Sequence, residues 1–506
     1  MHTPKRCLAG MLAALQMAML SAAPPAMAAT LTPIKHLVVI FQENVSFDHY
    51  FGTYPKAKNP AGEPVFTAAT NTPSVNGLTG GLLLANPNRV NPFRLDRSQA
   101  ATCDQNHDYT PEQQAFDFGL MDMFPRFTGV SGPGCPDYGL GTKLVMGYYD
   151  GNTVTAVWNY TKNFALSDNF FGTSFGPSTP GHVNLVSGQT HGASPANLSG
   201  ATIQGTIIGD ADPTGDVCSG ASSVSLVTGK NVGNLLNVKG ITWGYFQGGF
   251  DLAITNPDGS TGCGRTHTST VTRVKKTDYI PHHEPFQYYR STANLSHTRP
   301  SSVAAIGSTD AANHQYDIHD FSDALAAGNF PAVSFLKAPG YEDGHPGYSS
   351  PLDEQTFLAD TINTIEQNPA WATSTAIILT WDDSDGWYDH QMSPILSQSN
   401  TTADALTGVG HCGTAPAGAA QGRCGYGPRI PLLVISPYAK ANFVDHSVTD
   451  FTSILRFIED NWGLGRIGGG SLDNLSGPLA NLFDFTHARS VKVCLNPSTG
   501  EPETCL

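Results

Sequence analysis

Short apolar runs recur along this chain, and each one stops directly before polar or acidic side chains. Five runs carry the pattern: 36–41, 241–246, 331–336, 376–380 and 431–435. Because they lack polar alternation, they are typical of strands buried on both faces, as in a parallel sheet covered by helices. In such folds ligands bind beyond the carboxyl ends of the strands. The pattern therefore predicts a buried sheet with a functional site along one edge.

Amphipathic segments between these runs predict the covering helices. Residues 353–366 begin with acidic side chains and place Phe357, Leu358, Ile362 and Ile365 on one face, and residues 449–459 follow a similar pattern. Strand–helix alternation indicates the α/β class, here a three-layer α/β/α sandwich with a mostly parallel central sheet. Residues 29–506 are interpreted as one domain, with long loop insertions near 55–150 and 190–330, which are rich in Gly, Asn, Ser and Thr.

The first 28 residues have the three parts of a secretory signal peptide. Lys5 and Arg6 precede an apolar run, and Ala26-Met27-Ala28 offers a cleavage site between small residues. The run is too short for a stable transmembrane segment, and no other segment of the sequence is long and apolar enough for one. We therefore expect cleavage after Ala28 and a secreted or periplasmic protein.

Eight cysteines remain beyond the signal peptide, an even set that indicates disulfide bonds in an exported chain. The sequence leaves the connectivity open. Pairing of neighbours predicts Cys103–Cys135, Cys218–Cys263, Cys412–Cys424 and Cys494–Cys505. A zinc site is the competing interpretation, but no two cysteines have the close spacing of a structural zinc motif.

The formal net charge is −15 at pH 7, and removal of Lys5 and Arg6 makes it −17. This balance argues against nucleic acid or an anionic membrane surface as the main partner. The sequence leaves the oligomeric state open.

Acidic side chains crowd the segment Thr380–His390, which directly follows an apolar run. The neighbours Asp382 and Asp383 repel each other unless a cation or a proton neutralises them. Glu43 and Asn44 add a carboxylate and an amide oxygen after the first run. Such a pair alone is more often a helix cap. Together, the four residues predict a site for one divalent cation, with calcium, magnesium, manganese or zinc all compatible.

Ser178 lies in a turn bounded by Pro and Gly, before a segment near Asn184 that could begin a helix. A hydroxyl group that faces the N–H groups of a helix end suits an anion and an activated nucleophile. A simple turn or cap serine is the alternative. A metal ion able to deprotonate the hydroxyl group favours the interpretation of Ser178 as a nucleophile over that of a turn or cap serine.

Histidines recur in the polar segments, at His107, His282, His283 and His345. At mildly acidic pH their imidazolium groups would bind a phosphate-like dianion and protonate a leaving group. Metal ligation is the alternative role.

The segment Gln42–Gly52 resembles the signature of a bacterial phosphoesterase family that includes acid phosphatases and non-haemolytic-type phospholipases C. Further matching segments follow in the family's order: Gly176–Pro180, Pro281–Phe286, Thr380–Asp383, Asp385–His390 and Tyr426–Pro431. The resemblance spans nearly all of the mature chain and implies an alkaline-phosphatase-like fold with a single phosphoesterase catalytic domain.

The resemblance also implies residue roles. Metal ligation falls on Glu43, Asn44, Ser178, Asp382 and Asp383, with Ser178 as the nucleophile. The catalytic histidines fall on His107, His282, His283 and His345, and substrate binding falls on Asn44, His107 and His283. Two positions depart from the family pattern: Val45 stands where Arg is usual, and Gly181 stands where Asn is common.

The implied function is a secreted, metal-dependent acid phosphatase that cleaves phosphomonoesters through a phosphoserine intermediate. The alternative is a phospholipase C that cleaves the phosphodiester of phosphatidylcholine-type lipids, so the substrate is a small phosphate ester or a phospholipid head group. We expect no additional module after Leu506, and this favours the phosphatase. A catalytically silent binding protein is the interpretation from another class, and the retained metal, serine and histidine positions disfavour it.

Overall fold

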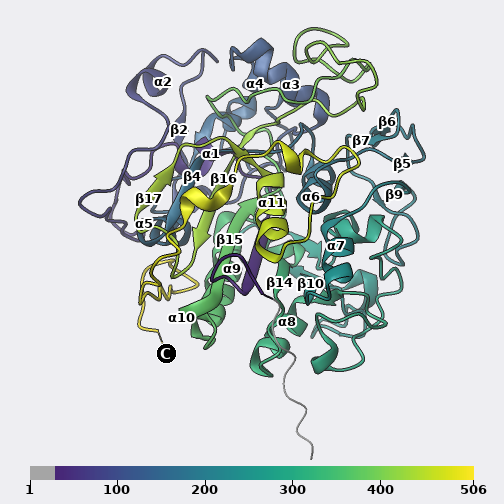
Figure 1. Cartoon of the computed structure of the whole chain (residues 1–506). Coiled ribbons are helices and arrows are strands. Elements are labelled where there is room, and N and C mark those ends of the chain that lie inside the picture. The colour runs from purple at the N-terminus through teal and green to yellow at the C-terminus, as the bar shows by residue number, and fades with distance from the viewer. Residues whose placement is uncertain (1–28, 506) are drawn as a thin grey trace, which may run out of the picture.

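The computed structural model describes residues 29–505 and is built around one nine-stranded sheet (Figure 1). The strand order is β13-β10-β14-β1-β15-β16-β4-β17, with β18 paired to β4. The strands are β1 (His36–Gln42), β4 (Ala165–Phe171), β10 (Trp243–Gln247), β13 (Gln315–Asp317), β14 (Val333–Lys337), β15 (Thr375–Trp381), β16 (Arg429–Ile435), β17 (Phe443–Asp445) and β18 (Thr449–Asp450).

α-Helices and short outlying strands accompany this sheet, together with short 3-10 helices such as Gly141–Met146 and Pro285–Tyr288. The α-helices are α1 (Phe47–Phe51), α2 (Gly80–Leu84), α3 (Tyr109–Phe116), α4 (Phe124–Phe127), α5 (Thr155–Asn163), α6 (Ser178–Ser187), α7 (Val232–Lys239), α8 (Ile318–Ala326), α9 (Pro351–Gln367), α10 (Trp371–Ser374) and α11 (Phe451–Trp462). The strands outside the large sheet are β2 (Phe93–Arg94), β3 (Gly147–Tyr148), β5 (Ala193–Ser194), β6 (Thr202–Ile203), β7 (Thr206–Ile207), β8 (Asp212–Pro213), β9 (Ser223–Leu226), β11 (Thr266–Thr268) and β12 (Lys275–Thr277).

The central sheet is mixed rather than purely parallel. Strands β13, β10, β14, β1 and β15 pair in parallel, and β17 and β18 are parallel to β4. Strand β16 runs antiparallel to both of its neighbours, β15 and β4. The reason is the connection from β15, which leaves and re-enters the sheet at the same edge. The sheet is thus mostly parallel, as the sequence predicted, but β16 is an antiparallel strand within it.

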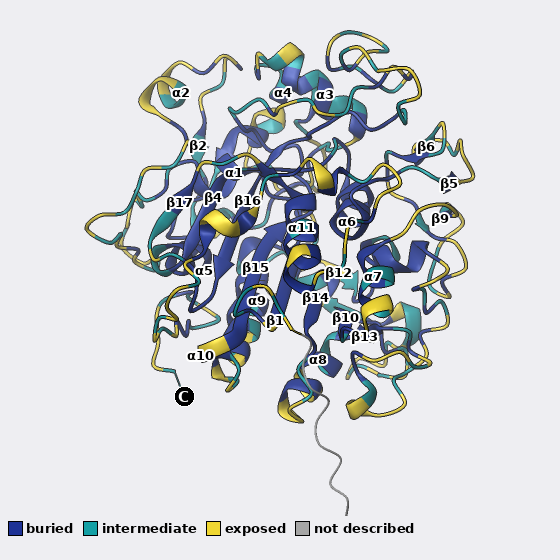
Figure 2. Cartoon of the chain, viewed as in Figure 1, coloured by how far each residue is buried: buried dark blue, intermediate teal, exposed yellow. Residues whose placement is uncertain are grey.

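Helices cover both faces of the sheet. On one face the Phe41 ring of β1 packs edge-on against Phe451 of α11 and His182 of α6. Trp381 of β15 is in register with the residue after Phe41, so its side chain points to the other face. There its indole N–H donates to Glu354 of α9 at 2.6 Å. The strands between the two helical layers are almost entirely buried (Figure 2).

The five apolar runs do form strands, and the two predicted helices correspond to α9 and α11. One boundary differs, because α6 begins at Ser178 rather than near Asn184. The stretch 190–330 supplies β10 and β13 to the central sheet, and 55–150 contributes α3 and α4. The division into one domain with insertions stays a prediction, and the signal peptide lies outside the described residues.

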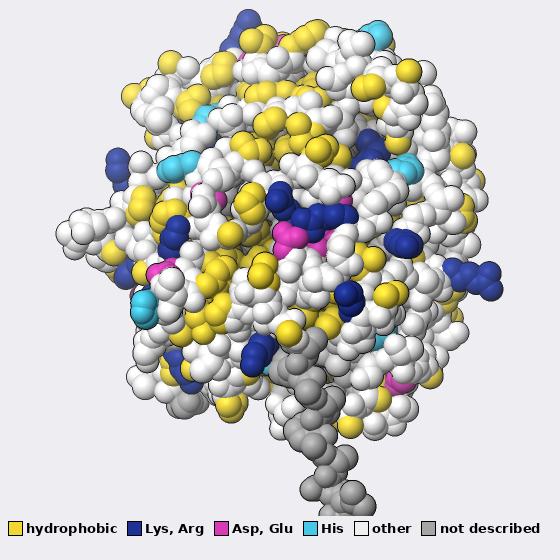
Figure 3. Space-filling model, in the orientation of Figure 1, with side chains coloured by type: hydrophobic (Ala, Val, Ile, Leu, Met, Phe, Trp, Pro, Cys, Tyr) yellow, Lys and Arg dark blue, Asp and Glu magenta, His cyan; other side chains and the backbone are white. Residues whose placement is uncertain are grey.

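Four disulfides join neighbouring cysteines, as the sequence predicted: Cys103–Cys135, Cys218–Cys263, Cys412–Cys424 and Cys494–Cys505. Among residues 29–505, none of the helices has both the length and the apolar character that a bilayer span requires. On the face shown in Figure 3, Lys and Arg side chains are scattered among polar and hydrophobic ones.

Candidate active site

Two adjacent parallel strands bring the predicted metal ligands together. Glu43 and Asn44 follow β1, while Asp382 and Asp383 follow β15, and all four side chains are buried. The Asn44 N–H donates to Asp382 Oδ1 at 2.9 Å. Asn44 adopts a left-handed backbone conformation with φ 69°, which Asn tolerates better than most residues. The carboxyl ends of neighbouring strands thus place both pairs at one point on the sheet edge.

Ser178 is the first residue of α6 and points toward this acidic group. Its hydroxyl group donates to Glu43 Oε2 at 3.0 Å and lies 3.4 Å from Asp383 Oδ2. Pro180 fits the first turn of α6, where its missing N–H costs no helical hydrogen bond. The helix also passes very close to the loop that carries Asp382 and Asp383, because a Cβ atom at Gly181 would lie 2.3 Å from the Asp382 carbonyl oxygen.

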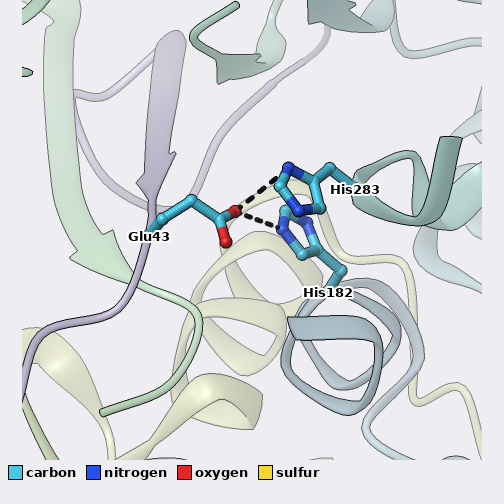
Figure 4. A group of neighbouring side chains, drawn as sticks. All are labelled: Glu43, His182 and His283. Carbon is cyan, nitrogen blue, oxygen red and sulfur yellow. Dashed lines mark hydrogen bonds and ion pairs between the residues drawn. The ribbon is translucent and has the colours of Figure 1, made fainter. Parts of the chain in front are cut away.

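Glu43 has nitrogen groups around its other oxygen. Glu43 Oε1 lies 3.0 Å from His182 Nε2, 3.3 Å from His283 Nδ1 and 3.2 Å from Lys337 Nζ. Figure 4 shows the two imidazole rings converging on this carboxylate from α6 and from the segment Pro281–His283. The ligand atoms of Glu43, His182 and His283 lie within 4.8 Å of one another, close enough to hold a metal ion. Glu43 therefore connects the two sets of predicted site residues.

The acidic side chains resist ionisation in the protein without metal. Burial and the charge of Glu43 raise the pKa of Asp382 to about 7. Burial and the neighbouring Asp382 raise the pKa of Asp383 well above its usual value. Burial alone would lower the pKa of Lys337, but Glu43 and Asp343 outweigh that effect and raise it. A cation bound here would take the place of the protons that the carboxyl groups otherwise retain.

The donor set fits a divalent cation. Asn44 Oδ1 and Asp382 Oδ2 are buried and have no hydrogen-bond partner among residues 29–505, although the Asn44 amide nitrogen donates to Asp385 Oδ1 at 3.0 Å. Buried oxygens without a partner are unfavourable unless something else satisfies them. With the nearby Glu43, Asp383 and Ser178 oxygens, they form the hard-oxygen environment that calcium, magnesium and manganese prefer. The histidine nitrogens beside Glu43 also suit zinc.

The histidines carry different charges around this centre. Burial lowers the pKa of His182 to about 3, and burial together with Lys337 lowers that of His283 well below its usual value. The pKa of His107 is lowered by burial, but Asp385, Asp104 and, more weakly, Asp210 outweigh this effect and raise it to about 10. In the metal-free protein His107 is thus the charged imidazolium while His283 is neutral. This differs from the expectation that mildly acidic pH charges the histidines together.

The remaining predicted residues lie around the same centre. His107 Nε2 is 3.5 Å from the Asn44 amide nitrogen, and the His107 and His345 rings have centroids 6.0 Å apart. His282 packs perpendicular to His283 at 4.6 Å and pairs with Asp212 at 3.3 Å. The structure therefore brings all nine predicted residues into one region. Their catalytic and ligand roles are treated as proposals below.

Sequence reasoning assigned no role to several residues that the structure places here: His182, Lys337, Asp385, Glu112 and Asp210. His182 is four residues after Ser178, a spacing that places both on one helix face. Lys337 ends a buried strand, a position that could have suggested a buried cation. Glu112 lies in the insertion 55–150, yet its carboxylate accepts from the Gly176 N–H at 3.1 Å and from the Ser384 hydroxyl group at 2.7 Å. Local sequence gave no signal for Glu112.

Comparison with known proteins identifies the family. The model of the Phosphoesterase family matches residues 34–465, which is most of the chain. The chain belongs to the Phosphoesterase family. The family proposed from the sequence motifs is thereby confirmed.

Several named proteins are similar to this phosphoesterase. Non-hemolytic phospholipase C of Pseudomonas aeruginosa is 25% identical over 495 residues, which cover 94% of this chain and 61% of the relative. Phospholipase C A of Mycobacterium tuberculosis is 25% identical, covering 86% of this chain and 74% of the relative. Non-specific phospholipase C6 of Arabidopsis thaliana is 23% identical, covering 82% and 63% respectively. The chain thus spans less than two thirds of the length of some of these relatives.

A likeness to solved structures is weaker. Murine ectonucleotide pyrophosphatase/phosphodiesterase 5 is 12% identical with a TM-score of 0.33, covering 65% of this chain and 95% of that chain. A score of this size does not inform the fold.

Proposed function

We propose that this phosphoesterase is a metal-dependent hydrolase of phosphoric esters that uses Ser178 as its nucleophile. The observation that carries the proposal is the position of the Ser178 hydroxyl group, at the first residue of α6 and within 3.4 Å of both Glu43 and Asp383. Those carboxylates, with Asp382 and Asn44, form the oxygen set suited to one divalent cation. Membership of the Phosphoesterase family supports the reaction class.

Each residue of the site would have its own role in the reaction. Glu43, Asn44, Asp382, Asp383 and Ser178 would hold a divalent cation, which when bound supplies charge neutralisation for the serine oxygen and the phosphoryl oxygens. The Ser178 hydroxyl group would pass its proton to Glu43 Oε2, to which it already donates at 3.0 Å, and Ser178 Oγ would form a bond to phosphorus while the bond to the leaving alcohol breaks in line. Among His107, His283 and His345, His107 is the charged imidazolium that can donate a proton to the departing oxygen, whereas His283 is neutral. Water then cleaves the phosphoserine and releases phosphate.

Acid phosphatase activity on phosphomonoesters is the first candidate within this class. The second candidate is phospholipase C activity, and the names of the relatives favour it. We extend the proposal to an alkaline-phosphatase-like arrangement of the fold. The four disulfides fit an oxidising compartment, so secretion or a periplasmic location is part of the proposal.

Replacement of the serine tests the mechanism. Ser178→Ala should lower turnover of p-nitrophenyl phosphate and of p-nitrophenylphosphorylcholine by at least about a thousandfold, because the covalent step is lost. Ser187→Ala, at the other end of α6, is the matched control and should retain most activity. Acid quenching during turnover should trap a phosphoryl adduct on the unchanged protein, detectable by intact mass. Normal turnover by Ser178→Ala would rule the mechanism out, and the ratio of the two rates separates the two candidate substrates.

A further inference from the structure

A carboxylate of the same chain occupies the N-terminal end of α6, the helix that presents Ser178. The Thr179 N–H and the Thr179 hydroxyl group both donate to Asp210 Oδ1, each at 2.9 Å. Free N–H groups at a helix start attract anions, including phosphate groups. Here the N–H group next to the proposed nucleophile is already bound to a negative charge. A phosphoryl group that reaches Ser178 must therefore approach Asp210.

Asp210 is held in place as an anion. It lies between β7 and β8, its side chain is 36% exposed, and its Oδ2 is 3.9 Å from His282 Nε2. Burial would raise the pKa of Asp210, but His282 and the Thr179 N–H outweigh that effect and lower it. Asp210 thus places a negative charge directly beside the residue that follows Ser178.

We propose that Asp210 makes the site select phosphoryl groups that carry one negative charge over those that carry two. The inference rests on the proposed function and specifies its substrate class: phosphodiesters, and phosphomonoesters in their singly protonated form. Like charges at close range disfavour each other, and the second charge of a monoester dianion adds to the repulsion. Partial exposure of Asp210 screens this effect, so it discriminates between substrates without excluding either.

The selection has a consequence for pH dependence. Phosphate monoesters lose their second proton near pH 6, whereas diesters keep a single charge at all higher pH values. Cleavage of a monoester should therefore decline above about pH 6 through ionisation of the substrate itself. Cleavage of a diester should show no such decline. An acidic optimum would then belong to the monoester reaction rather than to the enzyme as a whole.

A substitution that removes the charge of Asp210 but keeps the shape of its side chain tests the inference. Asp210→Asn keeps an oxygen that can accept from both Thr179 groups. At pH 7.5 we compare kcat/KM for p-nitrophenyl phosphate, a dianion, and bis(p-nitrophenyl) phosphate, a monoanion with the same leaving group. The ratio of monoester to diester kcat/KM should rise about tenfold in Asp210→Asn, with a smaller change for the diester. Asp212→Asn is the matched control, because Asp212 pairs with the same His282, whereas the Thr179 groups of α6 donate to Asp210. Its ratio should change less than about threefold.

Two further measurements keep the inference testable if Asp210→Asn folds poorly. Asp210→Glu retains the charge and should retain the preference of the unchanged enzyme. In the unchanged enzyme, kcat/KM for the monoester should fall between pH 6 and 8 while that for the diester stays level. Parallel pH profiles, or equal losses on both substrates in Asp210→Asn, would overturn the inference and leave Asp210 a purely structural role. Hydrolysis of neither substrate by the unchanged enzyme would instead remove the proposed function, and the inference with it.

Discussion

Lys337 Nζ lies 3.2 Å from Glu43 Oε1, and neither side chain has any exposure to solvent. The same ammonium group is 3.4 Å from Asp343 Oδ2. Lys337 therefore supplies a fixed positive charge on the sheet side of the proposed metal site. It holds Glu43 Oε1, while Glu43 Oε2 accepts the hydrogen bond from the Ser178 hydroxyl group.

Replacement of Lys337 by Met should destabilise the metal-free protein by about 3–5 kcal/mol, because Glu43 and Asp343 would remain buried without their partner. A divalent cation should recover part of this loss, since the positive charge it brings acts on the same carboxylates. Urea unfolding with chelator and with added cation measures both effects. Lys275→Met removes only an exposed pair with Asp258 and should cost no more than about 1 kcal/mol. Equal stability of the two variants would contradict the role given to Lys337.

Chelation should make stability fall as the pH rises. The pKa of Asp382 is about 7 in the folded metal-free protein, against 3.8 when exposed. The folded state thus binds more protons than the unfolded state. The resulting contribution to the free energy of unfolding is complete below about pH 3.8 and is lost as the pH rises through 7, at up to about 1.4 kcal/mol per pH unit. Unfolding free energies of the chelated protein between pH 5 and 8 test this, with Asp382→Asn as the comparison. The pH-dependent part should shrink in the variant; identical slopes would show that Asp382 ionises normally.

Glu112→Gln should lower kcat more than it changes KM. The Glu112 carboxylate joins the Gly176 N–H, two residues before Ser178, to the Ser384 hydroxyl group beside Asp383. Gln offers one acceptor in place of two, so one of these hydrogen bonds is lost, at a cost of about 1–3 kcal/mol. Initial-rate kinetics on p-nitrophenyl phosphate, with thermal unfolding in parallel, separate positioning from stability. A fall in stability without any change in kcat would assign Glu112 to the fold alone.

Arg429 should prove essential for folding rather than for the chemical step. Its guanidinium group donates to Asp389 and Asp48, both at 3.1 Å, and all three side chains are buried. Arg429→Met would leave Asp389 buried without its cation and Asp48 with only His390, 2.6 Å away, and should cost about 3–5 kcal/mol. Denaturant unfolding measures the loss. The partly exposed Arg456 is the control. Arg456→Met loses the ion pair with Asp460 and a hydrogen bond to the Ser476 carbonyl oxygen, and should cost about 1–2 kcal/mol. A small effect at Arg429 would refute this account.

The strands and the proposed ligands were predictable because each depends on a short segment. An apolar run without alternation describes β1 and β15 fully, and the residues that directly follow them are necessarily at the same edge of a parallel pair. Glu43 and Asp382 could therefore be placed together without knowledge of the intervening chain. The pairing of neighbouring cysteines was also correct, although the sequence itself left the connectivity open.

The partners of those residues were not predictable, because they depend on contacts between distant segments. Lys337 is 294 residues from Glu43 in the sequence, and nothing around it indicates which carboxylate it meets. Glu112 reaches the site from a stretch without a repeating pattern. The direction of β16 was not predicted, because an apolar run does not show which way its strand runs in the sheet. The direction follows from the loop after β15, which returns to the edge of the sheet at which β15 ends. The charge states of His107 and His283 likewise depend on side chains that are distant from them in the sequence.

Gly181 determines how closely α6 can approach the loop that carries Asp382. A Cβ atom there would meet the Asp382 backbone at 2.3 Å, so any larger residue would force the helix and the loop apart. Such a displacement would carry Ser178 away from Asp383, at the other end of the same contact. The absence of a side chain at Gly181 thus fixes the distance between Ser178 and the acidic loop that it faces.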